Sequence, residues 1–205
     1  MFALCYRLTR LAARIYLSPV RITLSGLEHV PAKGGAVVVA NHPCALDYFL
    51  MVYALKRGFC CMQRRENFRH PLAAWWLRKL RAVPAAQGED NRAALSLMEN
   101  WLRAGMLHVQ APEGDVSGDE TGPFLPGFIR MAQRANVPII PVSIAGSGQC
   151  LRERRRPRGF GQFVPRRCHV ILRFSPAVAP PRHAGSREDC LVLAAEIRRI
   201  IVDSL

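Results

Sequence analysis

The strongest structural signal in the chain is the segment Ala36-Val37-Val38-Val39-Ala40-Asn41-His42-Pro43-Cys44-Ala45-Leu46-Asp47. Its first five residues form an apolar run with β-branched side chains, which predicts a buried strand. Pro43 suits the first position of a helix, where a missing N–H group costs nothing, and we expect that helix to continue to Leu55. His42 then lies at the corner between strand and helix, and Asp47 lies about one turn into the helix.

This placement lets the His42 ring meet the Asp47 carboxylate. Five residues apart on one continuous helix, the two side chains would diverge by about 140°. With His42 outside the helix, its ring can fold back onto the carboxylate. A histidine held by an aspartate can take a proton from a hydroxyl group. The alternative, a helix-capping histidine with an unrelated surface aspartate, stays open at this point.

Size and composition indicate one globular domain with an anionic partner. The chain has 205 residues, of which half are apolar, enough to bury one core. Its formal charge is 29 − 15 = +14. Such an excess favours nucleic acid, an acidic membrane surface or a phosphorylated ligand as the partner. No apolar run reaches the roughly 18–20 residues that a membrane-spanning helix needs.

The cysteines and histidines do not suggest a metal site. The chain has seven cysteines, an odd number, and Cys60 and Cys61 are adjacent. This pattern indicates neither a disulfide framework nor a zinc site, so we expect mostly buried thiols in a reducing compartment. The histidines other than His42 lack the spacing of metal ligands; they are His29, His70, His108, His169 and His183.

Residues 1–20 are expected to form an amphipathic helix in a membrane interface, followed by one domain over residues 21–205. An apolar stripe runs beside a stripe of arginines; the residues are Leu4, Leu8, Leu11 and Ile15, and Arg7, Arg10 and Arg14. The arginines also argue against a signal peptide. A helix of this pattern lies with its apolar side in the membrane and its cations at the headgroups. The alternative is an ordinary helix packed on the domain.

The rest of the chain alternates between predicted strands and helices. Strands are expected at 21–26, 36–40, 58–62, 82–86, 106–111, 137–144 and 168–174, and helices at 71–80, 89–103, 127–136 and 187–204. This alternation predicts an α/β fold, a single domain with a largely parallel central sheet flanked by helices. Sites in such sheets form at the carboxyl ends of the strands. Two polar loops leave strands there, one with His42 and one with Pro112-Glu113-Gly114.

Three blocks in order resemble the glycerolipid acyltransferase family, of the 1-acyl-glycerol-3-phosphate O-acyltransferase type. They are Asn41-His42-Pro43-Cys44-Ala45-Leu46-Asp47, Pro112-Glu113-Gly114, and Val137-Pro138-Ile139-Ile140-Pro141-Val142. The resemblance covers about residues 21–174. It implies a glycerol-3-phosphate acyltransferase-like fold and a role in phospholipid biosynthesis. The reaction it implies is transfer of a fatty acyl group from acyl-CoA or acyl-carrier protein to the hydroxyl of a lysolipid, without metal or cofactor.

The resemblance also implies roles for individual residues. His42 would be the general base on the acceptor hydroxyl and Asp47 would orient it. The residues that would bind substrate are Asn41, Glu113, Gly114, Asp115 and Ser117. Backbone N–H groups near the loops would stabilise the oxyanion. Cys44 raises the alternative of an acyl-cysteine intermediate, but the position is variable in the family and a small buried thiol is the favoured interpretation.

The chain departs from the family where a phosphate would be held. Gln87, Val116 and Leu125 stand where phosphate-acceptor members carry an arginine, an arginine and a lysine. Carboxylates at Asp115, Asp119 and Glu120 would repel a phosphomonoester. The expected acceptor is therefore a neutral or amine-bearing lysolipid. Cations from elsewhere could replace the missing ones, the candidates being Arg64, Arg92 and Arg130.

Two other classes of function compete with acyl transfer. The charge is also typical of a nucleic-acid-binding module, but no helix-turn-helix, zinc-finger or RRM signature is present. A hydrolase acting on thioesters would need a serine elbow, and Ala145 breaks the G-x-S-x-G pattern around Ser147. The basic segment 151–167, of charge 7 − 1 = +6, is interpreted as a solvated loop, a membrane-facing patch or a carrier-protein or CoA site. We expect a peripheral protein on the cytoplasmic face of the membrane.

Overall fold

The computed structural model describes residues 1–85, 91–114, 116, 120–151, 164–180 and 186–205. Its helices are α1 (Phe2–Tyr16), α2 (Asp47–Ala54), α3 (Pro71–Lys79), α4 (Arg92–Arg103), α5 (Gly127–Ala135) and α6 (Arg187–Asp203). Its strands are β1 (Val20–Ser25), β2 (Ala36–Ala40), β3 (Phe59–Arg64), β4 (Ala82–Ala85), β5 (Leu107–Gln110), β6 (Ile139–Ala145) and β7 (Cys168–Phe174). The 3₁₀ turns are η1 (Leu27–His29), η2 (Arg65–Phe68) and η3 (Ser147–Cys150).

The strands form one sheet in the order β1-β7-β6-β2-β5-β3-β4. The only antiparallel pairing among the described strands joins β6 and β7, so the expected α/β fold with a largely parallel sheet is confirmed. The edge position of β4 fits Pro84, which cannot donate to a neighbouring strand.

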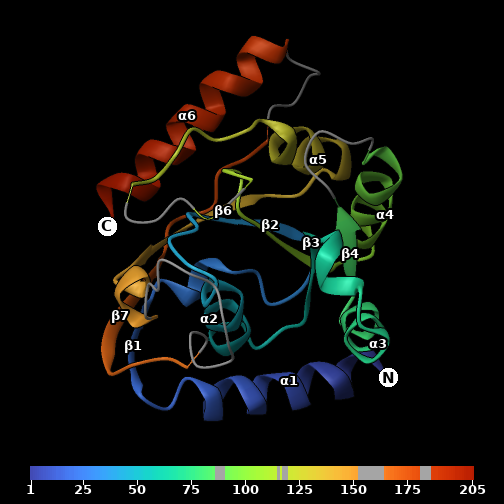
Figure 1. Cartoon of the computed structure of the whole chain (residues 1–205). Coiled ribbons are helices and arrows are strands. Elements are labelled where there is room, and N and C mark those ends of the chain that lie inside the picture. The colour runs from blue at the N-terminus through green and yellow to red at the C-terminus, as the bar shows by residue number, and fades with distance from the viewer. Residues whose placement is uncertain (86–90, 115, 117–119, 152–163, 181–185) are drawn as a thin grey trace.

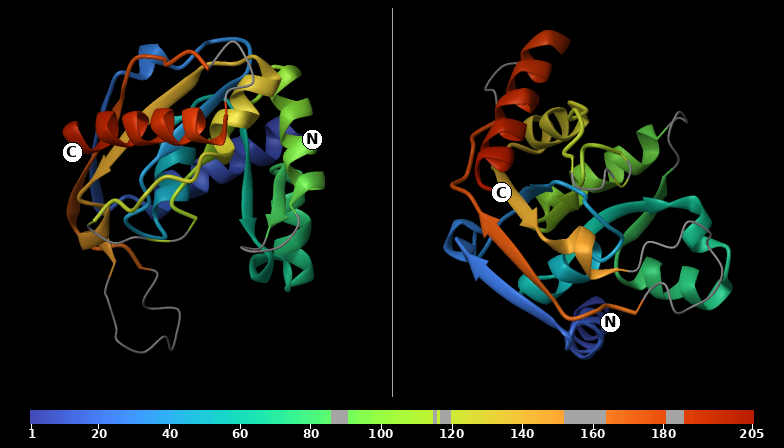
Figure 2. Two further views of the ribbon diagram at one scale, coloured as in Figure 1. Left: turned by 90° about the horizontal axis from the view of Figure 1, so that it is seen from above. Right: turned by 60° about the vertical axis from the view of Figure 1, so that its left-hand side comes forward.

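Helices cover both faces of the sheet. The first three helices pack on one face and the last three on the other, as Figures 1 and 2 show. The central strand β2 is buried along its whole length. Val38 faces the first layer while Val37 and Val39 face the second, because successive side chains of a strand point to opposite faces. A continuous apolar run is therefore what this position requires.

The expectation of no disulfide is wrong at one position. Cys150 and Cys168 are joined by a disulfide, with their Cα atoms 5.5 Å apart. The antiparallel pairing of β6 with β7 brings η3 beside the start of β7, a contact that spacing along the chain does not reveal. The free cysteines of the described chain are all buried, as expected.

The buried His108 on β5 predicts a stability that falls in acid. Burial lowers the pKa of this fully buried ring from 6.5 to about 4, and its Nε2 lies 3.2 Å from Gln110 Oε1. Because the unfolded chain takes up this proton first, the free energy of unfolding should fall as the pH drops from about 6.5 to 4. A shift of this size corresponds to about 3 kcal/mol. Denaturant titrations across this pH range should show a weaker dependence in His108→Gln, and an unchanged dependence would contradict the assignment.

Candidate active site

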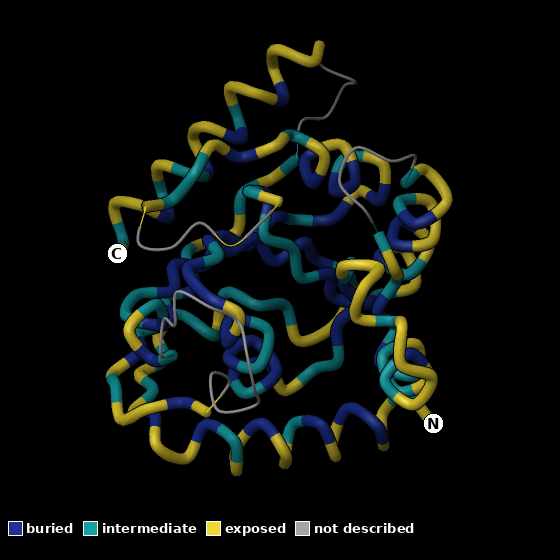
Figure 3. The backbone as a smooth tube through the Cα atoms, in the orientation of Figure 1, coloured by how far each residue is buried: buried dark blue, intermediate teal, exposed yellow. Residues whose placement is uncertain are grey.

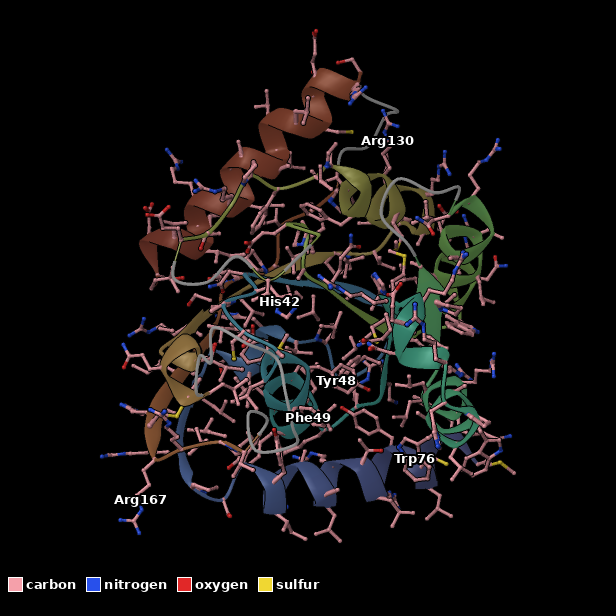
Figure 4. All side chains as sticks on the ribbon, in the orientation of Figure 1. His42, Tyr48, Phe49, Trp76, Arg130 and Arg167 are labelled. Atoms are coloured by element: carbon pink, nitrogen blue, oxygen red, sulfur yellow. A yellow bond between two sulfur atoms is a disulfide. The ribbon has the colours of Figure 1, made fainter. Side chains whose placement is uncertain are left out.

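Three loops meet at the carboxyl edge of the sheet. They follow β2, β5 and β6, and β2 lies between the other two strands. The β2 loop carries His42, the β5 loop carries Glu113 and the β6 loop carries Ser147. Figure 4 shows His42 at the centre of this edge, above the start of α2. The expected meeting of His42, Asp47 and Glu113 is present, with hydrogen bonds joining the three residues.

His42 and Asp47 form a hydrogen-bonded pair. His42 Nδ1 lies 2.8 Å from Asp47 Oδ2, and the two side chains are 28% and 5% exposed. An ionised carboxylate only accepts hydrogen bonds, so Nδ1 carries the proton. Nε2 is then the ring nitrogen with a lone pair, and the His42 side chain is partly exposed to solvent. This is the arrangement of a general base with an orienting carboxylate.

The start of α2 differs from the expectation that Pro43 begins the helix. α2 begins at Asp47, so Asp47 is its first residue and not one turn inside it. The cause is the carboxylate itself, because Asp47 Oδ2 also accepts the N–H of Cys44 at 2.9 Å. Residues 43–46 therefore form a tight turn around the carboxylate, and this turn brings Asp47 back towards His42.

Glu113 holds the backbone of His42. Its Oε1 accepts the N–H of His42 at 3.0 Å, and its Oε2 accepts the N–H of Gly122 at 3.2 Å. Gly114 follows with a φ of 82°, a left-handed conformation that glycine adopts without strain. Arg198 of α6 donates to the carbonyl groups of Thr121 and Gly122. The carboxylate thus links the β2 and β5 loops, and α6 supports the link.

The other residues expected to bind substrate are placed differently. Asn41 is buried, and its amide bonds both backbone groups of Ile144, donating at 3.0 Å and accepting at 2.8 Å. Its side chain thereby extends the pairing of β2 with β6 past the end of β2. Asp115 and Ser117 lie outside the described residues. Substrate contact by any of these residues remains a prediction.

Exposed apolar side chains occupy two positions at which phosphate-acceptor members of the family would carry cations. Val116 and Leu125 are 45% and 54% exposed, and Gln87 lies outside the described residues. Of the arginines considered as replacements, Arg64 lies at the end of β3, Arg92 begins α4, and both are exposed. Arg130 lies on α5, away from His42 (Figure 4).

Cys44 lies beside the pair but is not activated as a nucleophile. Cys44 is 7% exposed, and burial together with the Asp47 charge raises the pKa of its thiol to about 11. The thiolate is the reactive form of a cysteine, so this thiol is almost entirely protonated at neutral pH. This argues against the acyl-cysteine alternative.

Replacing Cys44 by alanine should therefore leave acyl transfer intact. We expect kcat within about threefold of the wild type, with a loss of about 1 kcal/mol in unfolding free energy because Leu46 N–H no longer reaches the sulfur at 3.3 Å. Steady-state kinetics and denaturant titration measure both. An acylated Cys44 peptide trapped from the wild type during turnover would contradict this prediction.

Two residues of the site were not predicted. Ser147 was considered only as a nucleophile, and Arg198 was not considered at all. The signal for Ser147 was its position, since it follows β6 directly, as His42 follows β2. For Arg198 the sequence offers no comparable signal, because Gly122, whose carbonyl it contacts, lies 76 residues away along the chain.

The fold and the pair together define an α/β protein with a hydrogen-bonded histidine–aspartate pair at the carboxyl edge of its sheet. An acyltransferase family model matches residues 21–145, so the chain belongs to the acyltransferase family. The 1-acyl-sn-glycerol-3-phosphate acyltransferase of Limnanthes alba is 25% identical over 171 residues, 80% of this chain and 57% of that relative. The alpha form from Ovis aries is 28% identical over 191 residues, 89% of this chain and 62% of that relative.

The chain thus spans less than two thirds of the length of these two curated relatives. A solved structure agrees with the fold over nearly the whole chain. It is the 1-acyl-sn-glycerophosphate (LPA) acyltransferase PlsC from Thermotoga maritima, with a TM-score of 0.72, 22% identity, and coverage of 98% of this chain and 79% of that one. This likeness includes the strands that position His42, Glu113 and Ser147.

Proposed function

We propose that the protein transfers a fatty acyl group from the thioester of acyl-CoA or acyl-carrier protein to the hydroxyl of a lysolipid. The observation that carries the proposal is the 2.8 Å contact between His42 Nδ1 and Asp47 Oδ2. It fixes the tautomer that presents a basic Nε2. Family membership and the names of the relatives support this chemistry.

In the proposed reaction the acceptor hydroxyl gives its proton to His42 Nε2 while its oxygen attacks the thioester carbonyl. Asp47 stabilises the imidazolium that results. The tetrahedral intermediate then expels the thiolate, which takes the proton back from His42. No enzyme nucleophile is needed, because a thioester is already activated. The protonated thiol of Cys44 is consistent with this direct transfer.

We propose further that the acceptor is a neutral or amine-bearing lysolipid rather than a phosphomonoester. The exposed side chains of Val116 and Leu125 support this choice, because they replace cations that would each contribute roughly 1.5–3 kcal/mol to holding a phosphate. Glu120 is exposed in the same segment and adds negative charge.

Acyl-transfer assays with purified protein test both proposals. Lysophosphatidic acid is compared with an amine-bearing lysolipid of the same acyl chain, using acyl-CoA and acyl-carrier protein in parallel. Faster turnover of the amine-bearing lysolipid is expected, and Val116→Arg with Leu125→Lys should shift the preference towards lysophosphatidic acid. Preference of the wild type for lysophosphatidic acid would reject the proposed acceptor. Thioester hydrolysis without transfer to any acceptor would reject acyl transfer itself.

We also propose that α1 lies on the cytoplasmic face of an anionic membrane. One face of α1 packs on the domain through Cys5, Tyr6, Thr9 and Ala13, and the opposite face is exposed (Figure 3). That face carries large apolar side chains, namely Leu4 (62% exposed), Leu8 (48%), Leu11 (57%) and Ile15 (68%). Within the described residues, no helix combines the length and the apolar character needed to cross a bilayer.

The neighbouring α3 extends this exposed apolar surface, and the net charge of +14 favours contact with an anionic membrane. Trp76 of α3 donates to Thr9 of α1 at 3.1 Å, and Leu72 and Trp75 of α3 are exposed.

Flotation with vesicles containing anionic lipid should recover the wild type and lose the double variant Leu8→Glu with Leu11→Glu. Glu substitutions at the exposed Leu191 and Val192 of α6 provide the matched control. Equal flotation of both variants would reject this surface, and binding to DNA but not to vesicles would favour a nucleic-acid module.

A further inference from the structure

A buried hydroxyl completes the hydrogen bonding of Asp47. Ser147 Oγ lies 2.8 Å from Asp47 Oδ1, and the two residues are 0% and 4% exposed. Because the carboxylate only accepts, the hydroxyl donates its proton to it. Oδ2 meanwhile accepts from His42 and Cys44. Both oxygens of the carboxylate are therefore fixed by protein donors.

We propose that Ser147 is a positioning residue, which sets the orientation of the Asp47 carboxylate and through it the tautomer of His42. This inference rests on the proposed role of His42 as the base. The terminal torsion of an aspartate is broad and roughly two-fold, so a carboxylate held on one oxygen alone can turn. A donor on Oδ1 keeps Oδ2 directed at His42 Nδ1, and the ring stays in the form with a basic Nε2.

The backbone on both sides of Ser147 is constrained. Gly146 has a φ of 80°, and a Cβ there would lie 2.3 Å from the carbonyl oxygen of His169, so this position requires glycine. At the other end of η3, Cys150 is bonded to Cys168, and its carbonyl accepts the N–H of Arg166 at 2.9 Å. The hydroxyl is thus fixed between β6 and β7, and Ser147 itself lies just beyond residues 21–145 that match the family model.

Two other roles for Ser147 fit the structure less well. As a nucleophile it would need access to substrate, and it is fully buried with its proton directed at Asp47. As a packing residue it would tolerate alanine, which differs only by the hydroxyl oxygen. A matched control separates packing from positioning, because Ser143 lies on β6, the strand before η3, is 1% exposed, and donates to the carbonyl of Ser204 instead.

The kinetic test compares Ser147→Ala with Ser143→Ala. Ser147→Ala should lower kcat by about 10- to 100-fold, as expected for a lost hydrogen bond to a charged group, and leave KM within about twofold because Ser147 does not reach substrate. Ser147→Thr should restore most of kcat and Ser147→Cys part of it, and Ser143→Ala should match the wild type. In an Asp47→Ala background, Ser147→Ala should change kcat by less than about threefold, since a positioning residue acts only through its target.

A spectroscopic test needs no substrate. The ¹⁵N shifts of labelled histidine report the tautomer of each ring, and the signal missing from His42→Ala belongs to His42. Ser147→Ala should increase the Nε2–H form of His42, and Ser143→Ala should not. Should Ser147→Ala fail to fold, Ser147→Cys tests the same point, because its thiol is a weaker donor and should increase the Nε2–H form to a smaller extent.

The outcomes of these tests distinguish the positioning role of Ser147 from the proposed acyl transfer. An active wild type that His42→Ala inactivates, with kcat and tautomer unchanged in Ser147→Ala, would overturn the positioning role alone. A tautomer change in a protein that transfers no acyl group would support positioning and reject the proposed function.

Discussion

Replacing His42 by alanine is expected to lower kcat for acyl transfer by about 10²–10⁴, the usual contribution of a general base. The ring is 28% exposed, so its removal should cost little stability. The backbone N–H of residue 42 keeps its bond to Glu113, so the loop should keep its shape. Initial rates at saturating thioester and acceptor measure the effect on kcat, and denaturant titration measures the free energy of unfolding.

His169→Ala provides the matched control for this variant. The His169 ring is also exposed and hydrogen-bonded, but to Thr23 on the far strand β1, 2.9 Å away. It should retain wild-type kcat. If His42→Ala turned over within about threefold of the wild type, His42 would not be the base, and the 2.8 Å contact with Asp47 would be structural only.

The elements that the sequence predicts well are those with local causes. The run Ala36–Ala40 is apolar at every position because β2 is covered on both faces, and that requirement is visible in the sequence. The same holds for α5, whose apolar positions at 128, 129, 131 and 132 follow a helical period. Polar residues directly after such strands then locate the site at one edge of the sheet.

The details that the sequence did not predict depend on specific side-chain contacts, one of them local and the other between distant segments. The start of α2 at Asp47 depends on a carboxylate that bonds the N–H of Cys44, which competes with the preference of Pro43 for the first helical position. The disulfide depends on the pairing of β6 with β7. Strand order is a global property, and a motif cannot reveal which loop will lie beside it.

Glu113 shows that the sequence also does not separate residues that bind substrate from residues that hold the backbone. A carboxylate in a Pro-Glu-Gly loop suggests substrate binding, and in the structure both its oxygens accept backbone N–H groups. Asn41 is similar, because its amide bonds the backbone of β6. Polar residues near a reactive pair divide into those that touch substrate and those that hold the pair, and only coordinates separate the two groups.

Asp47→Asn is expected to lower kcat by about 10²–10³ while preserving the fold. Two donors, His42 Nδ1 and Cys44 N, converge on Oδ2, so the carbonyl oxygen of asparagine should take that position. Its amide group then faces Ser147 Oγ, and the hydroxyl can turn to accept. His42 should therefore keep the reactive tautomer and lose only the negative charge that stabilises the imidazolium.

That lost charge sets the size of the effect. Two unit charges about 4 Å apart interact by roughly 4 kcal/mol at an effective dielectric constant of 20, which corresponds to about 10³ in rate. Asp189→Asn is the control, since Asp189 caps α6 at the surface, and it should leave kcat unchanged. Wild-type kcat in Asp47→Asn would show that the charge is not used. A loss far beyond 10³ with the Nε2–H tautomer would show that the amide had turned, so that orientation rather than charge is the larger contribution of Asp47.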